Sequence, residues 1–128
     1  KKYQTNSYAV DIDLLNITNS SINTKFNDAK VTIIHSNIFE NLVEKNFDII
    51  FWNLPYYEDK NKYLYPLIKN CHKYLAKKGK LIVGYNSMPL KEKEIIEFTT
   101  KNYNLKYLKG INFFWNNHIV SIIEKDIL

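Results

Sequence analysis

The chain has 128 residues, of which 45% are hydrophobic and 15% aromatic, and its formal net charge is +5. This length suits one domain with one core, and the abundant aromatic residues exclude an intrinsically disordered chain. The sequence contains no apolar run of about 18 residues and does not begin with a signal-peptide pattern, so we expect a cytoplasmic protein that does not enter a membrane.

The positive charge comes from lysine alone, because all 18 basic residues are lysines. Arginine is the usual residue for bidentate recognition of phosphate or guanine, so the charge is weak evidence for a nucleic-acid partner, which stays possible. The single cysteine, Cys71, cannot form an internal disulfide. No His or Cys residues have metal-ligand spacing, so we expect no metal and interpret Cys71 as a small core residue.

Strand-like and helix-like segments alternate along most of the chain. Four short apolar segments predict buried strands covered on both faces, at residues 7–12, 30–36, 47–52 and 80–85. Helical spacing of apolar residues predicts helices over residues 14–26, 62–79 and 89–104. In the second helix, Pro66 lies near the first turn and Gly79 is the predicted C-terminal stop.

The C-terminal part has a different pattern. Residues 105–115 and 118–125 are predicted to form two strands around a turn at Asn116 and Asn117, which makes an antiparallel hairpin at the edge of the sheet. Alternating strands and helices require crossover connections and parallel strands. The predicted fold class is therefore α/β, a Rossmann-like three-layer sandwich in a single domain, with a mostly parallel sheet and a C-terminal antiparallel hairpin.

Polar residues follow three of the predicted strands, at the edge where open α/β sheets bind ligands. The first strand ends in AVDID with Asp11, and the second ends in HSNIFE with Ser36 and Asn37. The third ends in FDIIFWNLPYY, in which an apolar strand stops at Asn53 and Pro55. Asn and Pro also form turns for purely structural reasons, so this motif alone does not establish a binding site.

Together with LAKKGKLIVGY, these segments resemble, in order and spacing, the class I methyltransferases that use S-adenosylmethionine and carry an Asn-Pro-Pro-Tyr-type motif. The resemblance covers roughly residues 8 to 86, and the motif is NLPY here. The family normally begins with a strand and a glycine-rich turn that contacts the cofactor, whereas this sequence has no glycine before Gly79. We therefore expect the first strand and the glycine-rich loop to be missing, and activity to require them.

The resemblance implies S-adenosylmethionine as cofactor and assigns residues to its binding. Asp11 would accept the ribose hydroxyls, and Ile12 would offer an apolar face to the adenine. Asn37 matches a position that is commonly Asp and contacts the adenine amino group, with Ser36 and Ile38 beside it. The alternatives, a solvated Asp11 and a plain turn at residues 36–37, remain open.

The resemblance also assigns catalytic roles to the NLPY motif. The Asn53 side-chain oxygen and the Leu54 carbonyl would accept the two N–H groups of a planar amino or amide nitrogen, Pro55 would hold Leu54 extended, and Tyr56 would stack on the target group. Asn53 would also border the cofactor. A merely structural turn is the alternative.

Three functions are compatible with these residues. The first is an S-adenosylmethionine-dependent N-methyltransferase whose acceptor is RNA, a protein side chain or a small molecule. The second is a ribosomal RNA adenine N6-dimethylase, which often carries NLPY itself, although the residues after Tyr57 differ from that pattern. The third is a non-catalytic binding or scaffold domain.

Overall fold

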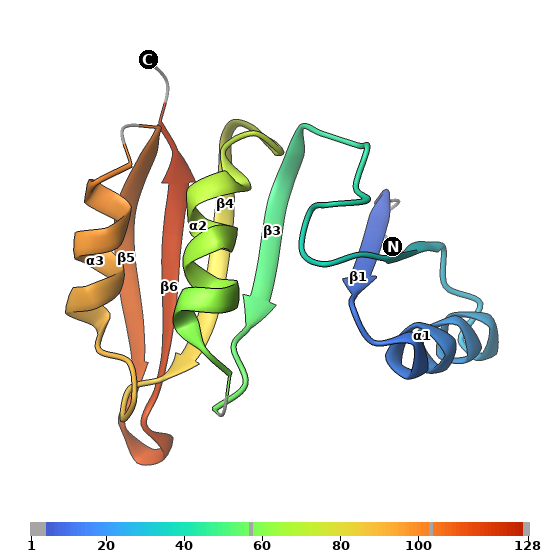
Figure 1. The fold of residues 1–128 in the computed structure, drawn as a ribbon, viewed down its shortest axis with the longest axis horizontal. Coiled ribbons are helices and arrows are strands. Elements are labelled where there is room, and N and C mark those ends of the chain that lie inside the picture. The colour runs from blue at the N-terminus through green and yellow to red at the C-terminus, as the bar shows by residue number, and fades with distance from the viewer. Residues whose placement is uncertain (1–4, 57, 103, 127–128) are drawn as a thin grey trace. The chain divides into compact units, whose positions relative to one another are not determined.

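The computed structural model describes residues 5–56, 58–102 and 104–126, and Figure 1 shows their fold as a ribbon. The chain divides into two compact units, Lys1–Val43 and Glu44–Leu128, which we describe separately. The prediction of a single domain stays a prediction.

Unit 1 is a parallel β-α-β arrangement. Strand β1 (Ser7–Asp11) pairs with β2 (Val31–His35), and helix α1 (Leu14–Phe26) connects them. Asp13 begins the helix as its N-cap, because its carboxylate accepts the backbone N–H groups of the next turn, at 2.7 Å from Leu15 N and 3.3 Å from Asn16 N. This cap compensates for the weak helix propensity of the Thr, Asn and Ser residues in α1.

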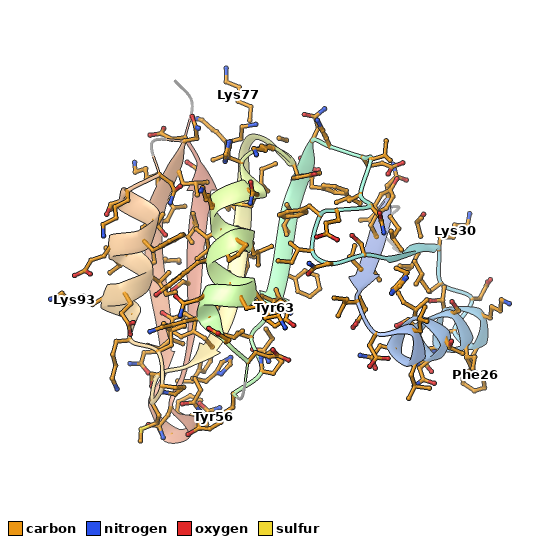
Figure 2. All side chains as sticks on the ribbon, viewed as in Figure 1. Phe26, Lys30, Tyr56, Tyr63, Lys77 and Lys93 are labelled. Atoms are coloured by element: carbon orange, nitrogen blue, oxygen red, sulfur yellow. The ribbon has the colours of Figure 1, made fainter. Side chains whose placement is uncertain are left out.

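Helix α1 has the predicted bounds, but its apolar side chains are not buried. Leu14, Leu15 and Ile22 are each more than half exposed, and Phe26 at its end is 88% exposed (Figure 2). Helix α1 contacts β1 and β2, but no side chain of the helix is fully buried.

Unit 2 contains a four-stranded sheet with the order β3-β4-β6-β5. In chain order its elements are β3 (Phe47–Asn53), a π-helical turn η1 (Lys60–Leu64), α2 (Tyr65–Cys71), β4 (Leu75–Asn86), α3 (Glu92–Thr100), β5 (Leu105–Phe113), a short 3₁₀ turn η2 (Phe114–Asn116) and β6 (His118–Lys125). Strands β3 and β4 are parallel, whereas β6 is antiparallel to both β4 and β5.

The Rossmann-like α/β class is confirmed at the level of strands and helices, but a mostly parallel sheet is not. The predicted hairpin exists, and Asn117 turns the chain with a positive φ of 53°. Its second strand, β6, lies inside the sheet between β4 and β5 rather than at the edge. Because β6 forms antiparallel pairs on both sides, the four-stranded sheet is mixed. The three-layer arrangement stays a prediction.

The core of unit 2 lies under α2 and α3, which cover the same face of the sheet (Figure 1). Its fully buried apolar residues are Leu64, Ile68, Cys71, Leu75, Leu81, Val83, Tyr85, Ile95 and Ile123. Cys71 is the predicted core residue, and burial raises the pKa of its thiol to about 12. The expectation of strands covered on both faces is not met by β3, where Ile49 and Phe51 are 57% and 80% exposed.

The predicted helix over residues 62–79 was too long. Helix α2 ends at Cys71, with Pro66 in its first turn as expected, and Leu75 begins β4 by pairing with Phe47. Gly79 does not stop a helix but lies in β4, where a Cβ atom would come within 2.7 Å of the Phe47 carbonyl oxygen. The register shifts at this point, because Ile49 pairs with Lys80, and the close approach of the two backbones requires a glycine.

Candidate active site

The NLPY motif begins inside the sheet. Asn53 is the last residue of β3 and is the register partner of Gly84, and the Leu54 N–H donates to the Gly84 carbonyl at 2.8 Å. The chain then leaves the sheet in a tight turn, in which the Pro55 carbonyl accepts the Glu58 N–H at 3.0 Å. The backbone of Asn53 and Leu54 is thus held by the sheet.

The two predicted acceptor groups have no competing partners in the described part of the chain. No described donor contacts the Asn53 side-chain oxygen, and none contacts the Leu54 carbonyl. Asn53 is exposed, whereas the Leu54 side chain is buried and anchors the loop. Both oxygens therefore remain available to a ligand at the carboxyl end of β3.

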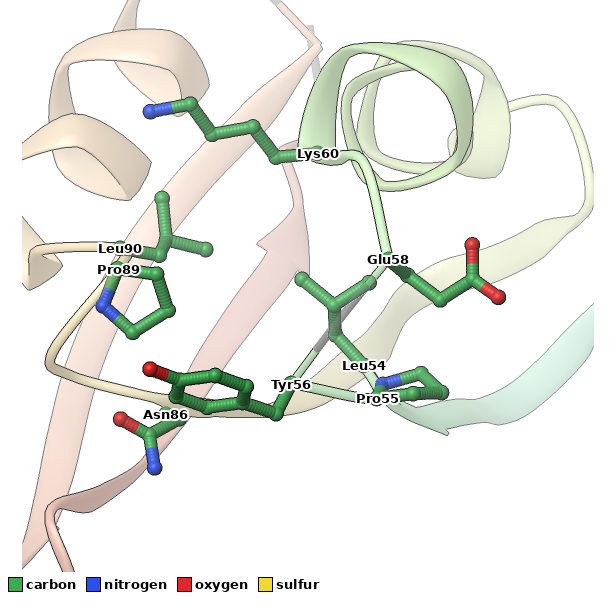
Figure 3. A pocket seen from close by; sticks show the side chains of 8 residues that line it. All are labelled: Leu54, Pro55, Tyr56, Glu58, Lys60, Asn86, Pro89 and Leu90. Carbon is green, nitrogen blue, oxygen red and sulfur yellow. The ribbon is translucent and has the colours of Figure 1, made fainter.

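A shallow pocket adjoins the motif (Figure 3). Its lining residues are Leu54, Pro55, Tyr56, Glu58, Lys60, Asn86, Pro89 and Leu90. Tyr56 is 66% exposed, and Figure 3 shows its ring on the same side of the pocket as Asn86 and Pro89. Its lining combines the aromatic ring of Tyr56 with apolar side chains and a few polar groups.

Ionic contacts hold the wall of this pocket. The Lys60 ammonium pairs with the Glu94 carboxylate, whose other oxygen accepts the Lys91 N–H at 3.0 Å. The hydrogen bond from Lys60 lowers the pKa of Glu94, and the same bond raises the pKa of Lys60. Glu94 thereby joins the η1 turn to the N-terminus of α3 and gives Lys60 a carboxylate partner at the wall of the pocket.

The candidate cofactor residues lie in unit 1, where β1 and β2 end side by side. The Asp11 carboxylate accepts the Asp13 N–H at 2.8 Å and the Asn16 amide at 3.2 Å, and the Ser36 N–H donates to the Asp11 carbonyl at 2.9 Å. These contacts fix the direction of the Asp11 carboxylate and leave lone pairs for hydroxyl groups. The neighbouring Ile12 side chain is 53% exposed, as expected for a surface that meets a ligand.

Residues 36–38 form a tight loop after β2. The Ser36 hydroxyl is buried and bridges the loop, donating to the Ile38 carbonyl at 3.2 Å and accepting the Asn41 N–H at 2.9 Å. The Asn37 amide nitrogen donates to Glu40 at 3.0 Å, which leaves its oxygen to accept another group. Ile38 has a φ of 53°, a strained conformation for a β-branched residue, and such strain often accompanies ligand-binding loops.

The predicted site residues thus form two groups, one in each unit. Asp11, Ile12 and residues 36–38 lie together in unit 1, and residues 53–56 lie in unit 2. A single cleft that joins the two groups remains a prediction. Asn86, the last residue of β4, also lines the pocket and was not among the predicted site residues, although a polar residue at the end of an apolar run was the signal used for the other strand ends.

Neither a metal site nor a membrane-spanning helix occurs in the described part of the chain. Over residues 5–56, 58–102 and 104–126, no three His, Cys, Asp or Glu side chains are grouped to hold a metal ion. In the same ranges, no helix is long and apolar enough to cross a membrane.

The family model "Methyltransferase small domain" matches residues 1–118. The chain belongs to this methyltransferase family. Comparison with curated proteins finds no match.

Solved methyltransferases have the same fold. A methyltransferase from Pyrococcus furiosus has a TM-score of 0.78 and 24% identity over 96% of this chain. The matched part covers 64% of the Pyrococcus furiosus protein. An S-adenosylmethionine-dependent methyltransferase from Clostridium acetobutylicum has a TM-score of 0.78 and 14% identity over 96% of this chain and 76% of its own. The N-methyltransferase NodS from Bradyrhizobium japonicum, solved with S-adenosyl-L-homocysteine, has a TM-score of 0.72 and 16% identity over 95% of this chain and 67% of its own.

At the level of the family, the predicted enzyme class, methyltransferase, and the predicted cofactor, S-adenosylmethionine, are confirmed. The NLPY assignment, the acceptor and the location in the cytoplasm stay predictions.

Proposed function

We propose that this protein is an S-adenosylmethionine-dependent N-methyltransferase that acts on a planar amino or amide nitrogen. The observation that carries the proposal is the pair of unoccupied acceptors at the end of β3, the Asn53 side-chain oxygen and the Leu54 carbonyl. Two acceptors on adjacent residues match the two N–H groups of a single NH₂ group.

A planar nitrogen is a poor nucleophile because its lone pair is delocalised into the neighbouring ring or carbonyl. Hydrogen bonds from its N–H groups to Asn53 and Leu54 draw the nitrogen toward a pyramidal shape and localise that lone pair. The same two oxygens stabilise the positive charge that develops on nitrogen as the new bond forms. Because the backbone of both residues is fixed by pairing with β4, the Leu54 carbonyl and the backbone that carries the Asn53 side chain are in place before the substrate binds.

The pocket beside the motif supports a planar acceptor. The exposed ring of Tyr56 offers a stacking surface, and Leu54, Pro89 and Leu90 provide apolar contact near it. Since Lys60 is already paired with Glu94, the wall of the pocket provides apolar contact and stacking rather than a free cation for phosphate. This arrangement suits the planar group itself, whichever larger molecule carries it.

The residues of unit 1 fit an adenosine-containing cofactor. S-adenosylmethionine supplies a methyl group attached to a positively charged sulfur. The Asp11 carboxylate is directed by two hydrogen bonds and would hold the ribose hydroxyls, as an acidic residue does at this place in dinucleotide folds. The Asn37 oxygen would accept the adenine amino group, and the exposed Ile12 side chain would pack on the ring.

One specific observation favours a second candidate. Leu54 in place of the first Pro of the motif is typical of ribosomal RNA adenine N6-dimethylases, so an adenine base in RNA is the second acceptor we consider. In that case the stacking partner of Tyr56 is a base taken out of its stack.

The experiment compares Asn53→Ala with the parent in the full-length protein. Labelled S-adenosylmethionine is supplied with total cellular RNA, with total cellular protein or with a cellular small-molecule extract as the acceptor pool. We expect Asn53→Ala to lower methyl transfer by about 100-fold or more while cofactor affinity, measured by calorimetry, is nearly unchanged. Asn112→Ala, an exposed Asn on β5, is the matched control and should keep the parent rate.

Each outcome has a definite meaning. Transfer to RNA alone favours the dimethylase, and transfer to protein excludes it. If Asn53→Ala transfers methyl groups at the parent rate, NLPY is a structural turn. Cofactor binding without transfer to any pool, small molecules included, indicates the non-catalytic domain.

A further inference from the structure

The absence of a side chain at Gly84 lets the ends of two polar side chains approach the backbone of β4. Gly84 lies on β4, opposite Asn53 of β3 and Val120 of β6. A Cβ atom at this position would be 2.5 Å from the Asn53 side-chain oxygen Oδ1 and 2.9 Å from His118 Nε2. The two polar atoms therefore point to the same spot above Gly84, from opposite sides.

The position of His118 is set by the backbone. It is the first residue of β6 and pairs with Asn86, and it follows Asn117, which has a positive φ of 53°. The Asn117 carbonyl accepts both the Ser87 N–H at 2.7 Å and the Ser87 hydroxyl at 3.0 Å. The β5–β6 turn is thus attached to the end of β4, and the partly buried imidazole is directed over Gly84.

Neither side chain has another hydrogen-bond partner among the described residues, and their polar groups are complementary. A carbonyl oxygen has two lone pairs, and an imidazole with its proton on Nε2 is a donor. The structure has no direct hydrogen bond between Asn53 and His118, and a rotation of the Asn53 side chain or one bridging water would join the two groups.

We propose that His118 is a positioning residue for Asn53. The His118 Nε2–H donates to Asn53 Oδ1 and thereby selects the orientation of the amide in which the second lone pair of Oδ1 receives the N–H of the methyl acceptor. This inference rests on the proposed role of Asn53 in methyl transfer. Gly84 belongs to the same arrangement, because any side chain there would separate the two groups.

Three substitutions in the full-length protein test the proposal. His118→Leu removes the donor, His118→Gln keeps an N–H donor at similar reach, and Gly84→Ala inserts a methyl group between Asn53 and His118. Gly84 does not have a positive φ, so alanine is compatible with its backbone conformation, and the added methyl group would displace the ends of the Asn53 and His118 side chains rather than backbone atoms. His72→Leu is the matched control, since His72 lies at the end of α2 and contacts the Lys69 carbonyl.

The first measurement needs no acceptor. The side-chain amide resonances of Asn53, recorded by NMR, should move in His118→Leu and Gly84→Ala and stay in place in His72→Leu. The second measurement is methyl transfer from labelled S-adenosylmethionine to the RNA or protein pool. We expect a fall of about tenfold or more in the transfer rate for His118→Leu and Gly84→Ala, with cofactor affinity retained and substantial recovery in His118→Gln.

The double variant Asn53→Ala/His118→Leu separates this inference from the proposed function. Because His118 acts through Asn53, the double variant should be no slower than Asn53→Ala alone. If Asn53→Ala itself keeps the parent rate, the proposed function fails. If Asn53→Ala is slow while His118→Leu keeps both the parent rate and the parent Asn53 resonances, only the role of His118 is refuted.

Discussion

A chain of hydrogen bonds under α3 allows a quantitative prediction about stability. The Tyr107 hydroxyl donates to the Glu92 carboxylate at 2.6 Å. The Ser121 hydroxyl lies 3.0 Å from the Tyr107 hydroxyl, and the Tyr85 hydroxyl lies 2.9 Å from the Ser121 hydroxyl. Tyr107 uses its single proton on Glu92, so it must accept from Ser121. Ser121 then has no proton left and must accept from Tyr85. The donors therefore follow one order in this hydrogen-bond network: Tyr85 to Ser121, Ser121 to Tyr107 and Tyr107 to Glu92.

This order predicts that Ser121→Ala is more harmful than Tyr85→Phe. Ser121 is fully buried, and its removal leaves the buried Tyr85 O–H without an acceptor, which should lower the free energy of unfolding by about 1–3 kcal/mol. Tyr85→Phe removes a donor and leaves only an acceptor lone pair on Ser121, so we expect a loss of about 0.5–1.5 kcal/mol.

Urea unfolding measures both free energies. A loss of about 2 kcal/mol moves the midpoint by roughly 1 M urea when the slope is about 2 kcal/mol per molar. Thr99→Val is the control, because the Thr99 hydroxyl is buried with no partner among the described groups, so its removal should be neutral or stabilising. A Tyr85→Phe variant that loses as much stability as Ser121→Ala would refute the assigned direction of the chain.

Three further predictions concern other parts of the molecule. Asp11→Ala should weaken S-adenosylmethionine binding by about 1–3 kcal/mol in calorimetry, since the ribose hydroxyls lose a charged acceptor; unchanged affinity would make Asp11 a turn residue. Burial raises the pKa of Cys71 from 9.0 to about 12, so the folded thiol keeps its proton at pH values where the unfolded thiol ionises. The contribution of Cys71 to stability should therefore be complete below pH 9 and decline from pH 9 toward pH 12. Rapid labelling of Cys71 by a thiol reagent in the native protein at neutral pH would contradict its burial. Because the pKa of Glu94 is lowered, Glu94→Gln should destabilise the protein at neutral pH by at most about 1 kcal/mol. The difference in stability between the variant and the parent should vanish as the pH falls through the acidic range where Glu94 takes up a proton.

Local signals predicted the elements whose causes are local. Helix α1 was predicted with its observed bounds from the helical spacing of its apolar residues, and the strands before the polar ends at Asp11 and Asn53 were found from their short apolar runs. The parallel pairing of β1 with β2 and of β3 with β4 follows from the crossovers. The same reasoning brought Asp11 and residues 36–38 to one end of a strand pair.

The failures have causes that are distant in sequence. Residues 75–79 contain Ala and Lys residues that favour a helix, but Leu75 pairs with Phe47, and that tertiary contact overrides the local preference. The central place of β6 could not be read from the hairpin, because a hairpin pattern is the same at the edge and inside a sheet. The meeting of Asn53, Gly84 and His118 depends on three strands whose order is known only in the fold.

NLPY lies at the end of a paired strand, so its first two residues have a fixed backbone while their acceptor oxygens stay accessible. The ladder between β3 and β4 continues one residue past Asn53, because the Leu54 N–H still donates to Gly84. Strand β3 ends at Asn53, and the Leu54 carbonyl accepts no hydrogen bond from a described residue, so this backbone oxygen lies open directly after the paired segment. A fixed backbone and a free oxygen therefore meet at adjacent residues, which is the preorganisation that stabilising a charged nitrogen requires.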